Sequence, residues 1–212
     1  MPAASPLAAL PYLPFDLLAP AEAPCSADAI FVFAGRPERK VYAVDLWRRG
    51  LAPILVLSIG RFEWRRIPRL GLPSDGGLVD LVSATPPPLR HFLLILDRRE
   101  GVCRLIPRGR FGTATEAAAL GHLVAERGLD SVLVVSAAVH LRRIAVSLAR
   151  VPMPRRPKWV LLAVPDSMTP IRRGHWWANA MTRQLVIDEW IKCLVYRLTP
   201  RRLLVPPADA SL

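Results

Sequence analysis

Ala29-Ile-Phe-Val-Phe-Ala-Gly35 and Ile54-Leu-Val-Leu-Ser-Ile-Gly60 are two short apolar runs; the first ends at Ala34 and Gly35, and the second at Ser58, Ile59 and Gly60. Such runs are typical of strands that are buried on both faces of a sheet. Between them, Pro37 stands where the first turn of a helix tolerates proline, and Gly50 ends the helical pattern. The segment therefore predicts a strand, a turn, a helix and a second strand. The residues expected to cover the inner face of this helix are Val41, Val44, Leu46 and Trp47.

The same alternation continues along the chain and predicts an α/β fold. Strands are expected at 92–96, 102–106, 131–136 and 159–164, the first two joined as a hairpin, and helices at 113–127, 140–150 and 176–198. Strands that alternate with helices indicate a Rossmann-like, mainly parallel sheet with helices on both faces, a three-layer sandwich. The last helix is expected to pack inward through Leu185, Val186, Ile187, Trp190, Leu194 and Val195.

The chain of 212 residues has the length of one α/β domain, which we place at 25–200. Residues 1–24 hold six prolines and are expected to be an irregular arm. Residues 61–107 are expected to form a variable insertion, whose first part, 61–88, is a surface excursion with at most one short helix. Residues 201–212 are expected to be a C-terminal tail.

The net charge of the chain is compatible with several kinds of binding partner. Lys and Arg outnumber Asp and Glu by 29 to 17, a net charge of +12, and all but three of the cations are arginines. This balance suits an anionic ligand, nucleic acid or an anionic membrane face, and it equally suits a genome rich in G and C that encodes Arg in place of Lys. No nucleic-acid recognition motif accompanies the charge, so nucleic acid is not the expected partner.

Several other sites and locations are disfavoured. The three cysteines lie far apart and predict no disulfide. The four histidines, His91, His122, His140 and His175, are widely separated, so we expect no fixed metal. No apolar run is long enough to span a bilayer, and the first 24 residues lack an export signal, which predicts a cytoplasmic protein that can reach the membrane periphery. Trp176, Trp177 and Trp190 are interpreted as anchors against the sheet rather than as membrane contacts.

Small, hydroxylic and ionisable residues follow the predicted strands. Ligands in open α/β sheets bind beyond the carboxyl ends of the strands, where helix N-termini offer free N–H groups to anions. Each residue also has a purely structural interpretation: the glycines as turn residues, and Thr113 with Glu116 as a helix capping box. The residues expected to bind a ligand are Gly35, Arg36, Arg39, Ser58, Gly60, Thr113, Ser136 and Arg143, and those expected to be catalytic are His140 and Glu116.

Several of these motifs, in this order, resemble the bacterial envelope-associated family that includes SanA, YdcF and ElyC. Residues 28–35 are similar to its D-A-I-V-V-L-G-G strand and loop, and residues 57–60 to its V-S-G-G loop. Ala34 and Ile59 each stand where the family has a glycine, and Gly112 where it has an asparagine, which puts the identity of the ligand in doubt. The remaining matches are Arg39 with Ala43, Gly50 with Ala52 and Pro53, Thr113 with Glu116 and Ala117, Val134 to Ala137 with His140 and Arg143, and Glu189, Trp190, Lys192, Tyr196 and Arg197.

The resemblance implies a polar pocket at the strand ends and a link to envelope biogenesis, with S-adenosylmethionine bound in one branch. Two hypotheses follow. In the first, the pocket binds an anionic or nucleotide-like molecule held by Arg39 and Arg143, and His140, oriented by Glu116, acts as general acid or base in phosphoryl hydrolysis. In the second, the protein is a noncatalytic sensor or scaffold of envelope assembly. The cofactor is undetermined, with S-adenosylmethionine and a nucleotide as candidates.

Overall fold

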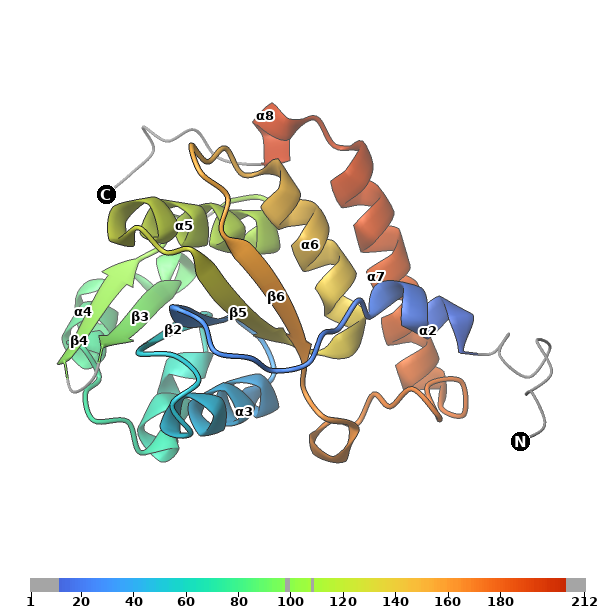
Figure 1. The fold of residues 1–212 in the computed structure, drawn as a ribbon, viewed down its shortest axis with the longest axis horizontal. Coiled ribbons are helices and arrows are strands. Elements are labelled where there is room, and N and C mark those ends of the chain that lie inside the picture. Colours follow the sequence, from blue (N-terminus) through green and yellow to red (C-terminus); the bar gives the residue numbers. More distant parts are fainter. Residues whose placement is uncertain (1–11, 98–99, 108, 205–212) are drawn as a thin grey trace.

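The computed structural model describes residues 12–97, 100–107 and 109–204. Its centre is a sheet of six strands in the order β4-β3-β2-β1-β5-β6 (Figure 1). β2, β1, β5 and β6 run parallel, whereas β3 is antiparallel to β2 and pairs with β4 as a hairpin. The strands are β1 (Ala29–Val32), β2 (Ile54–Ile59), β3 (Phe92–Asp97), β4 (Glu100–Leu105), β5 (Ser131–Ser136) and β6 (Lys158–Ala163).

The predicted α/β class is confirmed, because helices cover both faces of this mostly parallel sheet. One core lies between the sheet and α5 (Gly112–Arg127) with α6 (Leu141–Arg150), and it contains Phe31 and Phe33. The opposite core, which contains Ile30 and Val32, lies under α3 (Pro37–Arg48), η1 (Glu63–Leu70) and α4 (Leu78–Ala84). Successive side chains of β1 thus enter opposite cores, and the strand is buried on both faces. The other elements are α2 (Leu13–Leu18), η2 (Pro87–Leu89), η3 (Ala138–His140), η4 (Asp166–Met168), α7 (Ala180–Leu198) and α8 (Arg201–Leu204).

Three segments are more regular than expected. The proline-rich arm contains helix α2, which packs on α6 and α7, so the expectation of an irregular arm is wrong for 13–18; residues 19–24 form no helix or strand, and residues 1–11 lie outside the description. The expected tail begins with helix α8 and is described only to residue 204. Residues 61–88 contain a long 3-10 helix and an α-helix instead of at most one short helix.

Helix α7 begins at Ala180 rather than at 176, and it turns a different face inward than predicted. Of the six residues expected to pack inward, only Val186 is buried, and Leu185 is partly buried. The buried side is made by Thr182, Val186, Cys193 and Tyr196, because α7 packs along α6 and α2 and does not lie on the sheet. Ile187, Trp190, Leu194 and Val195 are exposed.

The tryptophans and helix α3 require a similar correction. Trp190 donates its indole N–H to the Pro14 carbonyl oxygen of α2 at 3.0 Å, so it anchors that helix and not the sheet. In α3, Val44 and Leu46 are buried as predicted, but Val41 is exposed. The first turns of α3 instead bury the cations Arg39 and Lys40.

Asp28 ties the start of β1 to the start of β5. Its carboxylate accepts hydrogen bonds from the backbone N–H groups of Asp130 and Ser131, each at 2.8 Å, and from the Ser131 hydroxyl at 3.0 Å. Burial alone would raise the pKa of Asp28, but these three hydrogen bonds outweigh burial and lower it.

We expect Asp28→Asn to lower the free energy of unfolding by about 1 kcal/mol at neutral pH, because hydrogen bonds to a partly solvated carboxylate are replaced by weaker neutral ones. A folded-state pKa below the unfolded one stabilises the fold above the ordinary Asp pKa of about 4, and this contribution is lost as the pH falls through the lowered pKa. Urea unfolding at several pH values measures both effects. Asp45→Asn, which removes an exposed i,i+4 pair with Arg49, is the control, and an equal loss there would contradict the assignment.

Candidate functional site

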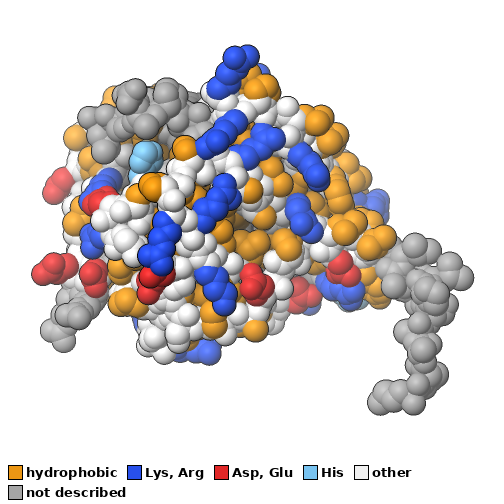
Figure 2. Space-filling model, turned by 45° about the horizontal axis from the view of Figure 1, so that its top comes forward, with side chains coloured by type: hydrophobic (Ala, Val, Ile, Leu, Met, Phe, Trp, Pro, Cys, Tyr) orange, Lys and Arg blue, Asp and Glu red, His pale blue; other side chains and the backbone are white. Residues whose placement is uncertain are grey.

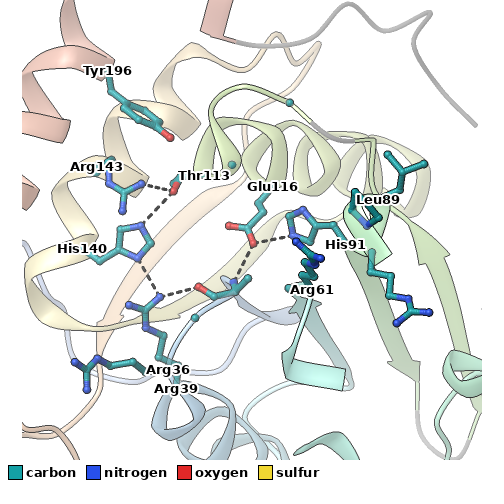
Figure 3. A pocket seen from close by; sticks show the side chains of 17 residues that line it. Arg36, Arg39, Arg61, Leu89, His91, Thr113, Glu116, His140, Arg143 and Tyr196 are labelled. Atoms are coloured by element: carbon teal, nitrogen blue, oxygen red, sulfur yellow. Dashed lines mark hydrogen bonds and ion pairs between the residues drawn. The ribbon is translucent and has the colours of Figure 1, made fainter. Parts of the chain in front are cut away.

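A cavity of about 500 Å³ opens where β1, β2 and β5 end. Its wall is formed by the residues that follow these strands and by the first turn of α5 (Figure 3). Eight of the ten predicted site residues line it: Gly35, Arg36, Arg39, Gly60, Thr113, Glu116, His140 and Arg143. Ser58 and Ser136 are fully buried behind the wall and do not line the cavity, so the structure does not place them in contact with a ligand there.

Glu116 connects two loops and strand β2 at the base of the cavity. Its Oε1 accepts hydrogen bonds from the Ala34 N–H at 3.0 Å and from the Ser58 hydroxyl at 2.6 Å, and it lies 3.1 Å from His91 Nε2. Burial would raise the pKa of this carboxyl group, yet the three contacts together lower it, so Glu116 is ionised at neutral pH. All three contacts fall on Oε1, and none of them occupies Oε2.

The capping-box interpretation of Thr113 and Glu116 is wrong. The N-cap of α5 is Phe111, and no side chain caps this helix end. Thr113 lies inside the first turn, where its hydroxyl oxygen contacts Arg143 and His140 instead of a backbone N–H. The first turn of α5 lines the cavity, and the side chain of its N-cap residue, Phe111, leaves the backbone N–H groups of this turn uncapped.

His91 belongs to the site but was not among the predicted site residues. Its Nε2 lies 3.0 Å from the Ser58 hydroxyl in addition to its contact with Glu116, and its side chain is 19% exposed and lines the cavity. The prediction considered only residues that follow strands, whereas His91 precedes β3. Because β3 is antiparallel to β2, its first residue Phe92 pairs with Ile59 at the end of β2, and this brings His91 to the same edge.

His140 is buried, and both ring nitrogens have partners. Nδ1 lies 3.2 Å from an Arg39 Nη1 and 2.9 Å from the Ser136 hydroxyl, and Nε2 lies 3.3 Å from the Thr113 hydroxyl. Since a guanidinium can only donate, Nδ1 must accept and the neutral ring carries its proton on Nε2. Burial, together with the nearby cations Arg143, Arg39 and Lys192, lowers the pKa of His140 well below 6.5. His140 is therefore neutral at physiological pH.

The sequence led us to expect that Glu116 orients His140, but the two side chains make no direct contact. The two residues belong to one chain of contacts that crosses the cavity wall, and the backbone of residue 34 and the side chain of Arg39 lie between them (Figure 3). Arg39 Nη1 donates to the Ala34 carbonyl oxygen at 2.9 Å as well as to His140. The chain of contacts runs from Arg143 through Thr113, His140, Arg39, Ala34 and Glu116 to His91.

Arg39 is a buried cation that has no carboxylate partner among the described residues. Its hydrogen-bond acceptors, Ala34 O and His140 Nδ1, are both neutral, and its Nε has none within the described chain. Only 9% of the residue is exposed, and it lines the cavity. Burial lowers the pKa of Arg39, an effect that more distant carboxylates, Glu116 first among them, partly offset. A guanidinium remains charged under these conditions, so a positive charge with no direct ion-pair partner among the described residues faces the cavity.

Arg143, by contrast, already has a counterion. It donates to both carboxylate oxygens of Glu189 on α7, at 2.9 and 3.1 Å, and to the Thr113 hydroxyl at 2.5 Å. Its guanidinium carbon also lies 5.3 Å from the centre of the Tyr196 ring. Burial would lower the pKa of Arg143, but the pairing with Glu189 raises it. Both partners on α7 come from the segment that carries the resemblance described above.

The loop glycines shape the cavity through Glu63, which the sequence did not single out. Glu63 Oε1 accepts the Gly35 N–H at 2.8 Å, and its other oxygen pairs with Lys40. A β-carbon at residue 60 would lie 2.7 Å from Glu63 Oε1, so glycine is required there for this contact. Gly35 has a φ of +136°, and a β-carbon there would lie 2.8 Å from Arg39 Nη1.

The two positions where a glycine of the resembled family is replaced differ in their surroundings. Ile59 is fully buried in the core beneath α3 and does not line the cavity. Its side chain therefore takes no space from a ligand. Ala34 does line the cavity, beside the N–H group that it donates to Glu116.

No group of three His, Cys, Asp or Glu side chains suited to a metal ion occurs in the described part of the chain. Comparison with protein-family models, with curated proteins and with solved structures finds no match to this chain. The family resemblance thus rests on the sequence motifs alone and stays a prediction.

Gly35→Ala should destabilise the protein more than Gly50→Ala does. Both glycines have positive φ, so each substitution strains the backbone by about 1 kcal/mol, but a β-carbon at residue 50 has no atom within 4 Å. At residue 35 it must also displace the Arg39 guanidinium from Ala34 and His140, and we expect a total loss of about 2–3 kcal/mol. Thermal unfolding of the two variants compares them directly, and equal losses would show that Gly35 is only a turn residue.

Proposed function

We propose that this protein binds a phosphate-bearing small molecule, such as a nucleotide, in the cavity at the strand ends. The observation that carries the proposal is the Arg39 guanidinium, which is buried at the cavity wall without a carboxylate partner. Burying an unpaired charge costs several kcal/mol, a cost that an anionic ligand would offset. The site thus lacks a negative charge that the ligand would supply.

The rest of the cavity supports an anion. Five arginines line it, whereas Glu116 is its only lining carboxylate within the described chain, and the Oε1 atom of that carboxylate is occupied by Ala34, Ser58 and His91. The first turn of α5 adds backbone N–H groups and the positive end of the helix dipole. Because Thr113 Oγ1 accepts from Arg143 and from His140, the hydroxyl proton is left to donate to a ligand oxygen. The lining arginines are Arg36, Arg39, Arg61, Arg90 and Arg143.

The same charge argues against S-adenosylmethionine as the ligand. That molecule carries a sulfonium and an ammonium group against one carboxylate, so its net charge is positive, and five arginines around one cavity disfavour it relative to an anion. A di- or triphosphate has the opposite sign and takes bidentate hydrogen bonds from guanidinium groups. We therefore favour a phosphorylated or nucleotide-like ligand over the S-adenosylmethionine-sensing alternative.

If the protein is an enzyme, we propose that it hydrolyses a phosphoryl bond with His91 as general acid or base. His91 reaches the cavity with a partly exposed ring beside the ionised Glu116, whereas His140 is buried and neutral with both nitrogens occupied. A water molecule would attack phosphorus and lose its proton to His91 while the bond from phosphorus to the leaving oxygen breaks, and the leaving oxygen would take up a proton. In this scheme His140 positions Arg39 and Thr113. The link to cell-envelope biogenesis follows only from the resemblance to the SanA, YdcF and ElyC family.

Arg39→Met tests the ligand proposal, because it replaces a buried unpaired cation with an apolar chain of similar length. We expect the free protein to unfold at a higher temperature and its affinity for ADP or inorganic pyrophosphate to fall about 10–100-fold, the loss of one or two charged hydrogen bonds. Calorimetric titration gives the affinity and a thermal scan gives the stability. Arg155→Met removes an exposed arginine outside the cavity and should change neither value. A variant that binds both probes as the wild type does would refute the role of Arg39.

His91→Asn separates binding from chemistry. We expect it to abolish phosphate release from whichever of ADP, pyrophosphate or p-nitrophenyl phosphate the wild type cleaves, while affinity changes less than about 3-fold, because His91 donates no charge-assisted contact to the anion. Phosphate release and calorimetric affinity are measured on the same preparations. Wild-type protein that binds a probe yet converts none, with or without divalent metal, would favour the sensor or scaffold hypothesis.

A further inference from the structure

The outward face of α7 is an apolar ridge, formed by Ile187, Trp190, Ile191, Leu194, Val195 and Leu198. These residues recur at helical spacing on the side opposite the buried Val186, Cys193 and Tyr196. Leu194 is 58% exposed and Leu198 is 72% exposed, although the sequence predicted a buried role for most of the ridge. Single exposed apolar residues are ordinary, but a contiguous apolar face marks an interaction surface.

The apolar surface continues from the ridge onto helix α2. α2 packs beside α7, and the Trp190 indole donates to Pro14 O, which fixes the two helices side by side. Leu13 and Leu17 of α2 are exposed by 51% and 44%. The ridge is therefore part of a wider convex surface that spans the length of a 19-residue helix.

Exposed cations flank the ridge on both sides and at its C-terminal end. The described part of α7 and α8 contains only two acidic residues, Asp188 and Glu189, and Glu189 already forms an ion pair with Arg143. Figure 2 shows one face of the molecule, on which Lys and Arg side chains lie next to hydrophobic ones and outnumber the acids. The flanking cations are Arg183, Lys192, Arg197, Arg201 and Arg202.

We propose that the ridge lies in the surface of an anionic membrane, parallel to the bilayer plane. An amphipathic helix with an apolar face, a tryptophan and flanking Lys and Arg residues binds there by burying the apolar face among the acyl chains while its cations meet the lipid phosphates. No helix among the described residues has the length and hydropathy to cross a bilayer, so the contact would be peripheral. The proposal is independent of the ligand in the cavity.

A second copy of the chain fits this surface less well. In an antiparallel pair of α7 helices, Arg183 of one copy would meet Arg197 of the other, and a parallel pair would place Arg197 against Arg197. Either arrangement brings like charges together at the rim of the interface, in a chain of net charge +12. Anionic headgroups complement this rim.

Sedimentation of the full chain with lipid vesicles tests the proposal. We expect the protein to bind vesicles of phosphatidylcholine that contain phosphatidylglycerol, to bind phosphatidylcholine alone weakly, and to be released in part by salt. The double variant Ile191→Glu/Leu194→Glu should reduce partitioning onto the anionic vesicles at least about 10-fold without lowering the unfolding temperature, because both side chains are exposed. Val79→Glu changes an equally exposed apolar residue on α4 and should bind as the wild type does.

A second variant, Arg197→Ser/Arg201→Ser, keeps the ridge intact and should weaken binding to anionic vesicles only. This variant still tests the proposal if the Ile191→Glu/Leu194→Glu variant does not fold. The proposal is overturned if the glutamate variant binds vesicles as the wild type does. It is also overturned if the wild type fails to bind vesicles and is a dimer in solution that the glutamate variant converts to monomers, since the ridge would then be an interface between copies.

Discussion

The unpaired charge of Arg39 is the constraint around which the site is arranged. A guanidinium that is 9% exposed and has only neutral acceptors is costly, and the surroundings keep it in place by specific means. Gly35 leaves room for it, and a neutral His140, with its proton on the far nitrogen, accepts from it. A protonated His140 could not accept that hydrogen bond and would add a second buried cation, so the low pKa of His140 and the position of Arg39 depend on each other.

The fold was predictable from the sequence because its central strands are buried on both faces. Such strands appear as short, continuous apolar runs, and β1, β2 and β5 all have this pattern. The parallel order also fixes where the strand ends meet, which is why eight of the predicted residues line one cavity. Ser58 and Ser136 lie near the ends of β2 and β5, but their side chains are buried behind the cavity wall, where they contact Glu116 and His140. The position of a residue in the sequence does not show whether its side chain reaches the cavity or lies behind its wall.

What the sequence could not show depended on long-range packing. His91 reaches the site only because β3 runs antiparallel to β2, and Glu63 reaches it because η1 packs along α3, which places Glu63 beside Lys40 in the first turn of that helix. Helix α7 has apolar residues on two opposite faces, so its periodicity alone cannot decide which face packs on α6. The face of α7 that packs on α6 carries small and polar groups, among them Glu189 and Tyr196, which contact Arg143.

The location of the arginines bears on why the chain is so basic. A compositional bias of the genome places arginine where it costs little, on the exposed surface, and it accounts well for residues such as Arg155, whose side chain is 83% exposed. It does not account for Arg39, because an unpaired buried guanidinium lowers stability and the substitution to an apolar residue would be tolerated by the fold. A protein retains such a destabilising group where function requires it. The strongest functional signal in this chain is therefore not its net charge of +12 but Arg39, the one buried Lys or Arg among the described residues that forms no ion pair.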